Sequence, residues 1–543
     1  MNDMVSIFDF DASSEESSFD SQTKCSYDTL SLRSVFSDVG AFPGKSVNTD
    51  DFANRVVRLA RQNHAGFTIV HANTERVSLA RDPIGLCSIY YYLDRRNNQL
   101  LVSSDLSDLK EFASLRGLRL TWSKEYFFRY LLELPYDWLT PFEEIGRLQR
   151  GHLVCFSSGG VMLDRRYWSW SEELTANYPD QGKVLCVLED CIQKLLSGYE
   201  NITVQVSGGF DSSAILCLLG EVLNVKPNAF SFVFPSFPRS DERQYLAALE
   251  EYADIDEFVF EPSEMPSWSE NPFLSAGEPG ALLDTAMLGP ISRKLKNYGA
   301  IFTGYGGDQL WRGDMAYLAD LLRQFEVVSF IRELLFAGYE RSCGPWTIMR
   351  KYVMPEWRES GFCTAVPQWI SHDLLRTNHL VDKEDRLPPD LRMLSCTVRS
   401  RIADLSTSAG YQWADENIYG RFGATRLHPF YSMPLIREVM NIEAKFRKWR
   451  GNDRILMRSV VDGIVPKKIL SRKCTGVTGD FYIEIIRNNV KYIEHLVEQH
   501  KISFSEFVDI TNFEKQLKSV KFGVINDFRL RNAINLLIWI AQQ

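Results

Sequence analysis

The chain has 543 residues, 45% of them hydrophobic and 24% charged, which are the proportions of a globular protein. Its length predicts about three or four domains, or two large ones. Acidic side chains outnumber basic ones by 70 to 61, and the net charge of −9 argues against nucleic-acid binding and against attraction to anionic membranes. The ten cysteines include no C-x-x-C pair, which excludes zinc ribbons and thioredoxin-type motifs and favours a reducing compartment.

The ends of the chain carry no targeting or membrane signal. The first residues, MNDMVSIFDFDASSEESSFDS, are acidic and rich in serine, and they lack the basic and apolar regions of a signal peptide. The most apolar late run, Ile534–Ala541, is far shorter than the ~20 residues that span a bilayer. We therefore expect a soluble, cytoplasmic protein.

Residues 1–175 are expected to form an α+β domain. Strand-like runs occur at Gly66–Val70, Cys87–Tyr92 and Leu100–Ser104, and helix-like stretches occur at Phe52–Gln62 and Trp122–Leu132. The stretch Ser171–Asp180 has the composition of a linker, so a second domain is expected over residues 181–543.

Strand and helix alternate at the start of this second domain. The expected elements are a helix at Val184–Leu196, a strand at Ile202–Val206, a helix at Ser212–Leu223, a strand at Ala229–Phe234, a helix from Asp241, a strand at Glu257–Phe260, a helix at Met287–Asn297 and a strand at Ala300–Thr303. Such alternation predicts a parallel sheet with right-handed crossovers. From about residue 315 to the end the pattern is mainly helical.

The run S-G-G-F-D-S-S at residues 207–213 lies between a predicted strand and a predicted helix, at the end of a strand where open α/β sheets bind ligands. Its glycines let the backbone approach a phosphate, and the following helix offers free N–H groups and a positive dipole end. Its serines add hydroxyl donors, and its aspartate suits Mg²⁺. No lysine follows, so it is not a Walker A loop. The residues expected to bind nucleotide here are Ser207, Gly208, Gly209, Asp211, Ser212 and Ser213; the alternative is an ordinary glycine-rich helix start.

A second glycine-rich run, T-G-Y-G-G-D-Q-L-W-R-G, occupies residues 303–313. The two runs resemble the pyrophosphate loop and the second loop, S-G-x-G-x-D-E-x-x-x-G, of the asparagine synthetase-like branch of the ATP-pyrophosphatase superfamily. Two flanking stretches also resemble the family. R-D-P-I-G and Y-Y within residues 81–91 are similar to R-D-x-x-G…Y-Y of its glutaminase domain. R-I-L-M-R at 454–458 and V-P…R-K within 465–473 are similar to its K-x-x-L-R…L-P…R-x-K stretch.

The resemblance covers about residues 60–480 and implies a two-domain fold. Residues 1–175 would form an Ntn-hydrolase (glutaminase)-like α+β domain. Residues 181–543 would form an α/β PP-loop domain of the adenine nucleotide α-hydrolase-like type, with a parallel sheet and a mainly helical extension.

The resemblance also implies ATP-dependent amide formation. A substrate carboxylate would attack the α-phosphate of ATP, pyrophosphate would leave, and an amine would displace AMP. Magnesium would bridge Asp211, Asp308 and the phosphates, and Lys473 would stabilise developing negative charge. Thr303 and Gly304 would touch the nucleotide. Val259 would face the adenine, unless it is a plain core valine.

One departure from the family concerns the source of the amine. Glutamine-dependent members carry a catalytic cysteine directly after the initiator methionine. Here Asn2 follows Met1, and the first cysteine is Cys25. The N-terminal domain is therefore expected to be a degenerate glutamine amidotransferase-like domain, and the attacking amine to belong to the substrate.

Tyr305 and the G-G-D-Q that follows it indicate which members of the family the chain resembles most. β-Lactam synthetases place a tyrosine in this slot of the second loop, where a phenol can help to deprotonate an amine. The whole run looks most like that of lasso peptide cyclases. These join an Asp or Glu side chain of a leaderless peptide to its N-terminal amine, and they imply a leader-binding protein and a leader peptidase as partners. We expect such a macrolactam synthetase, with Tyr305, Lys473 and Asp308 as catalytic residues.

Two alternatives remain open at this point, and a third is disfavoured. One is a small-molecule amide synthetase, either β-lactam synthetase-like or an ammonia-dependent asparagine synthetase. Another is a non-catalytic nucleotide-binding scaffold. A sulfur-inserting tRNA enzyme is disfavoured by the acidic charge and the absence of C-x-x-C.

Several further residues have a structural and a functional interpretation. The slot of the family's R-x-P-F-x-D reads L-H-P-F-Y-S at 427–432, so His428 is either catalytic or, by preference, a hydrogen-bonded structural histidine. Asp284-Thr285 either contacts substrate or, by preference, caps a helix, and Cys186 and Cys191 either form a metal pair or, by preference, pack in a core. The aromatic residues Trp311, Trp346, Trp357, Phe362 and Trp369 either pack in the core or line a peptide groove.

Overall fold

The computed structural model describes residues 6–9, 49–72, 76–134, 136–158, 160–174, 180–224, 226–270, 272–288, 291, 294–295, 297–354, 366–376, 389–406, 409–449, 452–472, 479–523 and 527–543. Cys25, Trp357, Phe362 and Lys473, which the sequence singled out, lie outside these ranges. Within them, antiparallel strands come first and βα units follow from residue 181.

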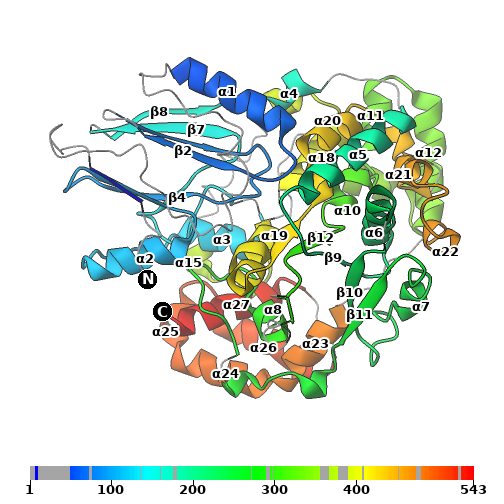
Figure 1. Ribbon diagram of the computed structural model, residues 1–543. Helices are drawn as coiled ribbons and strands as arrows, with labels where there is room; N and C mark the ends of the chain where they lie inside the picture. The colour runs from blue at the N-terminus through cyan, green and yellow to red at the C-terminus, as the bar shows by residue number, and fades with distance from the viewer. Residues whose placement is uncertain are drawn as a thin grey trace.

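The N-terminal part is built from two antiparallel sheets. One has the order β2-β3-β7-β8 and the other β1-β5-β4-β6. Figure 1 shows α1 (Thr49–Gln62) on the outer side of the first sheet and α2 (Leu106–Leu115) on the outer side of the second, which gives an α+β arrangement in four layers. The strands are β1 (Ser6–Asp9), β2 (Thr68–Ala72), β3 (Val77–Arg81), β4 (Tyr90–Asp94), β5 (Gln99–Ser103), β6 (Gly146–Arg147), β7 (His152–Ser157) and β8 (Gly160–Arg166).

Apolar side chains from both sheets form the core between them. Leu79 of β3, Leu100 of β5 and Val154 of β7 are buried in one cluster. The rings of Tyr91 and Phe156 meet with their centroids 5.1 Å apart. Because every second side chain of a strand points to the same face, these short strands each present an apolar face to the partner sheet.

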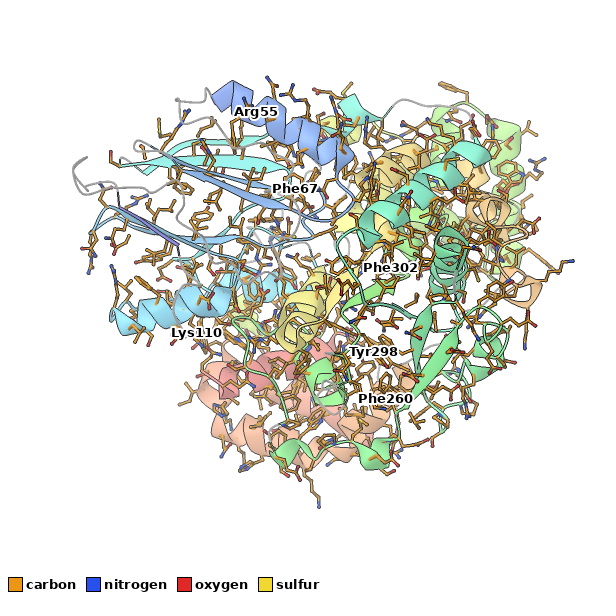
Figure 2. All side chains as sticks on the ribbon, viewed as in Figure 1. Arg55, Phe67, Lys110, Phe260, Tyr298 and Phe302 are labelled. Carbon is orange, nitrogen blue, oxygen red and sulfur yellow. The ribbon has the colours of Figure 1, made fainter. Side chains whose placement is uncertain are left out.

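A five-stranded parallel sheet forms the centre of the second part, as the sequence predicts. Its order is β11-β10-β9-β12-β13, and all neighbouring pairs are parallel. The strands are β9 (Ile202–Gln205), β10 (Asn228–Val233), β11 (Asp254–Val259), β12 (Ala300–Thr303) and β13 (Thr425–Leu427). Phe302 of β12 and Phe67, just before β2, belong to one buried cluster and are both marked in Figure 2.

The strand order places a topological switch point between β9 and β12. From β9 the chain adds β10 and then β11 on one side, whereas β12 and β13 extend the sheet on the other side. The segments that follow two such neighbouring strands diverge, and the crevice at their carboxyl ends is where doubly wound sheets bind ligands. Both glycine-rich runs start at this edge, the first ahead of α6 (Phe210–Leu223) and the second ahead of α10 (Gly307–Trp311).

The C-terminal helices join the two parts through a common core. The rings of Phe127, on α3 (Lys124–Leu132), and Trp539, on α27 (Leu530–Ala541), have centroids 5.6 Å apart. Phe127 also meets Phe507, with ring centroids 4.5 Å apart. One buried cluster therefore contains residues of both parts. Among the described residues, no helix is long and apolar enough to cross a membrane.

Two local expectations differ from the structure. A described helix, α8 (Leu282–Leu288), precedes the expected Met287–Asn297, several residues of which lie outside the described ranges, and Asp284 lies in the first turn of α8 instead of capping it. There Asp284 accepts a hydrogen bond of 2.8 Å from the hydroxyl of Tyr482. The helix expected from Asp241 is the single turn α7 (Arg243–Leu246), after which the backbone continues in turns, with Ala248 N–H donating to the carbonyl oxygen of Tyr245.

Candidate active site

The conformation of the first loop, residues 207–213, depends on the positive φ of a glycine and on a hydrogen bond from a buried arginine. Gly208 has a φ of +70°, in the left-handed region that favours glycine. Arg472 donates a 2.6 Å hydrogen bond from Nη1 to the carbonyl oxygen of Gly208, and it also pairs with Glu242. No side chain caps α6, so the amide groups of its first turn remain for an anion.

The serines of this loop differ in their environment. The N–H of Ser207 donates to Ser212 Oγ over 3.2 Å, so these two residues close the loop on itself. Ser213 is fully buried, and its hydroxyl donates to the carbonyl oxygen of Gly209 over 2.7 Å. The Ser213 hydroxyl therefore shapes the start of α6 and is already engaged before any phosphate binds.

The second loop, residues 303–313, packs directly against the first. A Cβ atom on Gly304 would come within 2.5 Å of the Ser212 backbone nitrogen. A Cβ atom on Gly307 would come within 2.4 Å of the Asp211 carboxyl carbon. These distances are too short for any side chain, so two glycines of the second loop allow the two runs to interlock at the sheet edge.

The interlocked loops bring two carboxylates to one guanidinium. Arg454 Nη2 lies 2.9 Å from Asp211 Oδ2 and also contacts Asp308 Oδ1. Burial raises the pKa of Asp211 to about 7; Arg454 opposes this rise, and Asp308 adds to it. Within the described part of the chain, Asp211 Oδ1 has no hydrogen-bond partner. The site thus holds an under-satisfied carboxylate beside a second, half-exposed one.

This donor set fits a magnesium ion that is shared with phosphate. Two carboxylates, one of them with an unpartnered buried oxygen, are hard oxygen ligands of the kind that Mg²⁺ prefers. Across the described ranges, no three His, Cys, Asp or Glu side chains gather into a metal site. A metal held by Asp211 and Asp308 would therefore need further oxygens from a bound nucleotide or from water.

Three arginines place positive charge beside the loops. Arg458 donates a 2.7 Å hydrogen bond to the carbonyl oxygen of Arg472, and its Cζ lies 4.9 Å from the ring centroid of Phe210. Arg454 and Arg472 each contact the first loop or its aspartate. The flanking match at 454–458 pointed to this region, but the sequence did not identify any of these arginines as a site residue.

A chain of hydrogen bonds runs from the second loop to a buried aspartate. Thr303 Oγ1 lies 2.6 Å from His428 Nδ1, and His428 Nε2 lies 2.7 Å from Asp415 Oδ2. Burial alone would raise the pKa of Asp415, but Arg426 and His428 lower it overall. His428 is therefore hydrogen-bonded on both ring nitrogens, which agrees with the structural interpretation of this residue and ties it to Thr303.

Tyr305 lies beside this chain of hydrogen bonds. Its ring centroid is 5.8 Å from that of His428 and 4.8 Å from Arg426 Cζ. Its N–H donates to Thr303 Oγ1 over 3.3 Å. The phenol is thus near a cation and a histidine, at the edge of the loop that carries Asp308.

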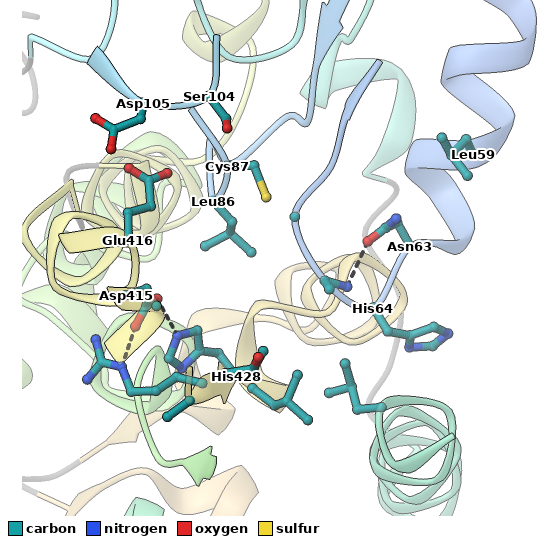
Figure 3. A pocket seen from close by; sticks show the side chains of 18 of the residues that line it. Leu59, Asn63, His64, Leu86, Cys87, Ser104, Asp105, Asp415, Glu416 and His428 are labelled. Carbon is teal, nitrogen blue, oxygen red and sulfur yellow. Dashed lines mark hydrogen bonds and ion pairs between the residues drawn. The ribbon is translucent and has the colours of Figure 1, made fainter. Parts of the chain in front are cut away.

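A cavity of about 1500 Å³ lies between the two parts of the fold and ends at this network. Its walls come from residues 55–66, 86–90 and 104–108 on one side and from residues 190–199 and 415–428 on the other. Figure 3 shows Cys87, Asp415, Glu416 and His428 among the side chains that line it. The two glycine-rich loops are not part of its lining, so His428 separates the cavity from Thr303.

Burial tunes the acidic groups of the cavity. It raises the pKa of Glu416 to about 7 and that of Asp108 to about 6. It also raises the pKa of the Cys87 thiol well above its ordinary value, which makes this cysteine a poor nucleophile. The described wall of the cavity therefore carries two carboxyl groups whose pKa lies near neutral pH, and the thiol of Cys87 in this wall is not activated.

The remaining predicted residues are scattered. Val259 is the last residue of the edge strand β11 and is 50% exposed, so it is not a core valine. Cys191 is buried and contacts the carbonyl oxygen of Pro429, whereas Cys186 is exposed. Among the described aromatic candidates, Trp311 and Trp369 are buried in different clusters and Trp346 is exposed, so these three do not line one groove.

Two glycine-rich loops and a carboxylate pair at the switch point of a parallel sheet are features of an α/β nucleotide-binding domain. The sequence model of the asparagine synthase family matches residues 183–539, and the chain belongs to this family. The chemistry of the family is ATP-dependent amide-bond formation. Among curated proteins, no sequence matches the chain.

Proposed function

We propose that the protein is a macrolactam synthetase of the lasso peptide cyclase kind. It would adenylate an Asp or Glu side chain of a leaderless peptide and join it to the peptide's N-terminal amine, releasing AMP and pyrophosphate. The observation that supports adenylation is the interlocking of the two loops, which brings Asp211 and Asp308 onto Arg454. The first loop and α6 would hold the departing phosphates.

The size and position of the cavity support a peptide as the substrate. A cavity of about 1500 Å³ exceeds the ~300–1000 Å³ of a typical small-molecule site. It ends at His428 and Asp415, one side chain away from Thr303 and Tyr305. A peptide in the cavity would therefore lie beside His428, with its reacting groups one side chain away from the second loop.

The residues would then divide the work as follows. Asp211 and Asp308 would hold Mg²⁺, which when bound offsets charge on the phosphates. Tyr305, whose ring centroid lies 4.8 Å from Arg426 Cζ, would assist removal of a proton from the attacking amine. Lys473, outside the described residues, would stabilise negative charge on the reacting phosphate. Val259 would contact the adenine from the edge strand.

The N-terminal part would be an Ntn-hydrolase-like relic without glutaminase activity, over residues 1–175. The only cysteine that Figure 3 labels in the cavity, Cys87, has a raised pKa and does not replace an N-terminal nucleophile. The amine would therefore come from the peptide. A leader-binding protein and a leader peptidase would supply that peptide.

The first experiment measures AMP and pyrophosphate release from Mg-ATP with three substrates. These are a pool of leaderless acidic peptides, aspartate with ammonium, and carboxyethyl-arginine. Release with peptide alone, together with loss of one water from the peptide mass, supports macrolactam formation. Release only with a small molecule would move the assignment to a small-molecule amide synthetase, and no release in the presence of partner proteins would favour a scaffold.

A second experiment separates the two half-reactions. Tyr305→Phe keeps the ring beside Arg426 but removes the hydroxyl, so we expect ATP–pyrophosphate exchange to persist while ring closure falls about 100-fold or more. Tyr492→Phe, on α24 (Val490–Gln499), removes a tyrosine hydroxyl elsewhere and should change neither step. Equal loss of both steps in Tyr305→Phe would contradict the proposed role.

A further inference from the structure

Helix α12 (Val327–Glu340) is apolar on two opposite faces, but only one of them is covered. Phe330 and Ala337 point inward and pack with α11 (Tyr317–Arg323) and α13 (Pro345–Ile348). Val328, Ile331, Leu335 and Tyr339 recur every three or four residues and form a stripe on the exposed side. The outward face of a surface helix normally carries polar side chains, so this exposed apolar stripe departs from the usual pattern.

Two flanking aromatic residues enlarge the stripe. Phe325 just before the helix is 87% exposed and Trp346 on α13 is 68% exposed, while Tyr339 is 85% exposed. A fully buried aromatic ring removes about 150–250 Å² from water, so these three rings alone offer roughly 350–600 Å². We call the set Phe325, Val328, Ile331, Leu335, Tyr339 and Trp346 the α12 face. Single scattered apolar residues need no explanation, but a contiguous patch of this size marks an interaction site.

We propose that the α12 face is the contact surface of a homodimer, in which the α12 helices of two copies pack antiparallel. A standard interface covers about 800 Å² on each partner, and the three rings with the aliphatic stripe come to about this area. A two-fold contact requires a surface that is complementary to itself. An antiparallel pair centred between Glu333 and Leu334 sets Glu326 of one copy opposite Arg341 of the other, and both side chains are exposed.

The inferred interface leaves the candidate active site accessible. Figure 1 places α12 along the outer edge of the molecule, on the side away from the antiparallel sheets that bound the cavity. The helix contributes no residue to either glycine-rich loop. The inference therefore does not rest on the proposed function and can fail independently of it.

Sedimentation of the purified full-length chain tests the dimer. Interfaces of this size bind in the micromolar range or tighter, so we expect the wild type to sediment as a dimer at about 20 μM. The double variant Val328→Glu with Leu335→Glu places four charges in the contact and should sediment as a monomer, with ATP–pyrophosphate exchange per chain unchanged. Leu115→Glu is the matched control, because Leu115 is also a large apolar residue, 80% exposed, but lies on α2. A wild type that stays monomeric, or a double variant that stays dimeric, would overturn the proposal.

Cysteine cross-linking tests the antiparallel arrangement. In the register given above, position 328 of one copy lies opposite position 339 of the other. Oxidation of the variant Val328→Cys with Tyr339→Cys should give a covalent dimer, whereas each single variant and the wild type should not. A covalent dimer from Val328→Cys alone would instead place the two helices parallel and contradict the proposed contact.

Discussion

Gly307 packs directly against the side chain of Asp211, with no room for a Cβ atom between them. A Cβ atom at residue 307 would lie 2.4 Å from the Asp211 carboxyl carbon, which is a steric clash. We therefore expect Gly307→Ala to push the two loops apart at the carboxylate pair. A displacement of about 1 Å at a reacting centre can cost 100-fold in rate, so ATP–pyrophosphate exchange should fall at least about 100-fold.

Gly344→Ala provides the control for this substitution. Residue 344 has ordinary backbone geometry at the start of α13, and an added Cβ would meet nothing within 4 Å. This variant should exchange pyrophosphate at the wild-type rate. If Gly307→Ala retained full exchange, the interlocking of the loops would not matter for nucleotide binding.

The raised pKa of Asp211 predicts a specific pH dependence of stability. The carboxyl binds its proton up to a pH of about 7 in the folded chain but only up to its ordinary value of 3.8 when unfolded. The folded state therefore holds the extra proton between these values, and the contribution of Asp211 to stability decreases as pH rises from about 4 to 7. Asp211→Asn removes this contribution to the slope.

The measurement is the melting temperature of wild type and Asp211→Asn between pH 5.5 and about 8, without nucleotide. We expect the variant to gain on the wild type as pH rises through the window, and the difference to level off above it. The variant should also lose ATP–pyrophosphate exchange. Parallel melting curves across all pH values would show that Asp211 is an ordinary ionised carboxylate in the folded chain.

Asp415 is expected to be important for stability because it neutralises a buried cation. It pairs with Arg426, whose side chain is only 2% exposed. Breaking a buried ion pair by removing one partner costs about 3–5 kcal/mol, so Asp415→Asn should lower the free energy of unfolding by about this amount.

Asp373→Asn offers the matched comparison. Asp373 pairs with Arg376 over 3.8 Å, but both side chains are largely exposed. Surface pairs contribute about 0–1 kcal/mol, so urea unfolding of this variant should resemble that of the wild type. Similar losses in both variants would contradict the role given to the buried pair.

His428 is expected to act through Thr303 instead of on the substrate. Loss of its hydrogen bond leaves the Thr303 hydroxyl free to turn, and a lost hydrogen bond of this kind costs about 1–3 kcal/mol. We expect His428→Ala to raise KM for ATP about tenfold or more, with a smaller effect on kcat. His495→Ala, at an exposed position of α24, should leave both constants unchanged. A loss confined to kcat would assign His428 to the chemical step.

The sequence predicted those features that depend on local pattern. The strands Ile202–Val206 and Ala300–Thr303 were found within one residue, because parallel strands covered on both faces are continuous apolar runs. The two loops were found because glycine spacing between strand and helix has few other uses. That Asp211 and Asp308 share one site was an implication of the family resemblance, and in the structure both contact Arg454.

Other parts of the site depend on contacts between segments that are distant in the chain, and such contacts cannot be predicted from the local pattern of a single sequence. Arg454 is 146 residues from Asp308, and Asp415 is 13 residues from His428 across a helix and a strand. The start of α8 at Leu282 was not predicted, because Asp284 resembles a capping residue, whereas its partner Tyr482 comes from a helix far along the chain. The cavity could not be foreseen, since it is formed by two parts of the fold together.

The contact between α3 and α27 has a consequence for how this architecture changes over time. Phe127 and Trp122 from the N-terminal part pack on Trp539, and Asn532 of α27 donates a 3.1 Å hydrogen bond to the carbonyl oxygen of Tyr130. A single substitution can remove the catalytic activity of a domain without changing its packing. Deletion of the whole N-terminal part, in contrast, would expose the apolar side chains of α27 to water. The N-terminal part is therefore a structural support for the C-terminal part, whatever chemistry it carries, because the interior around the last helix is incomplete without it.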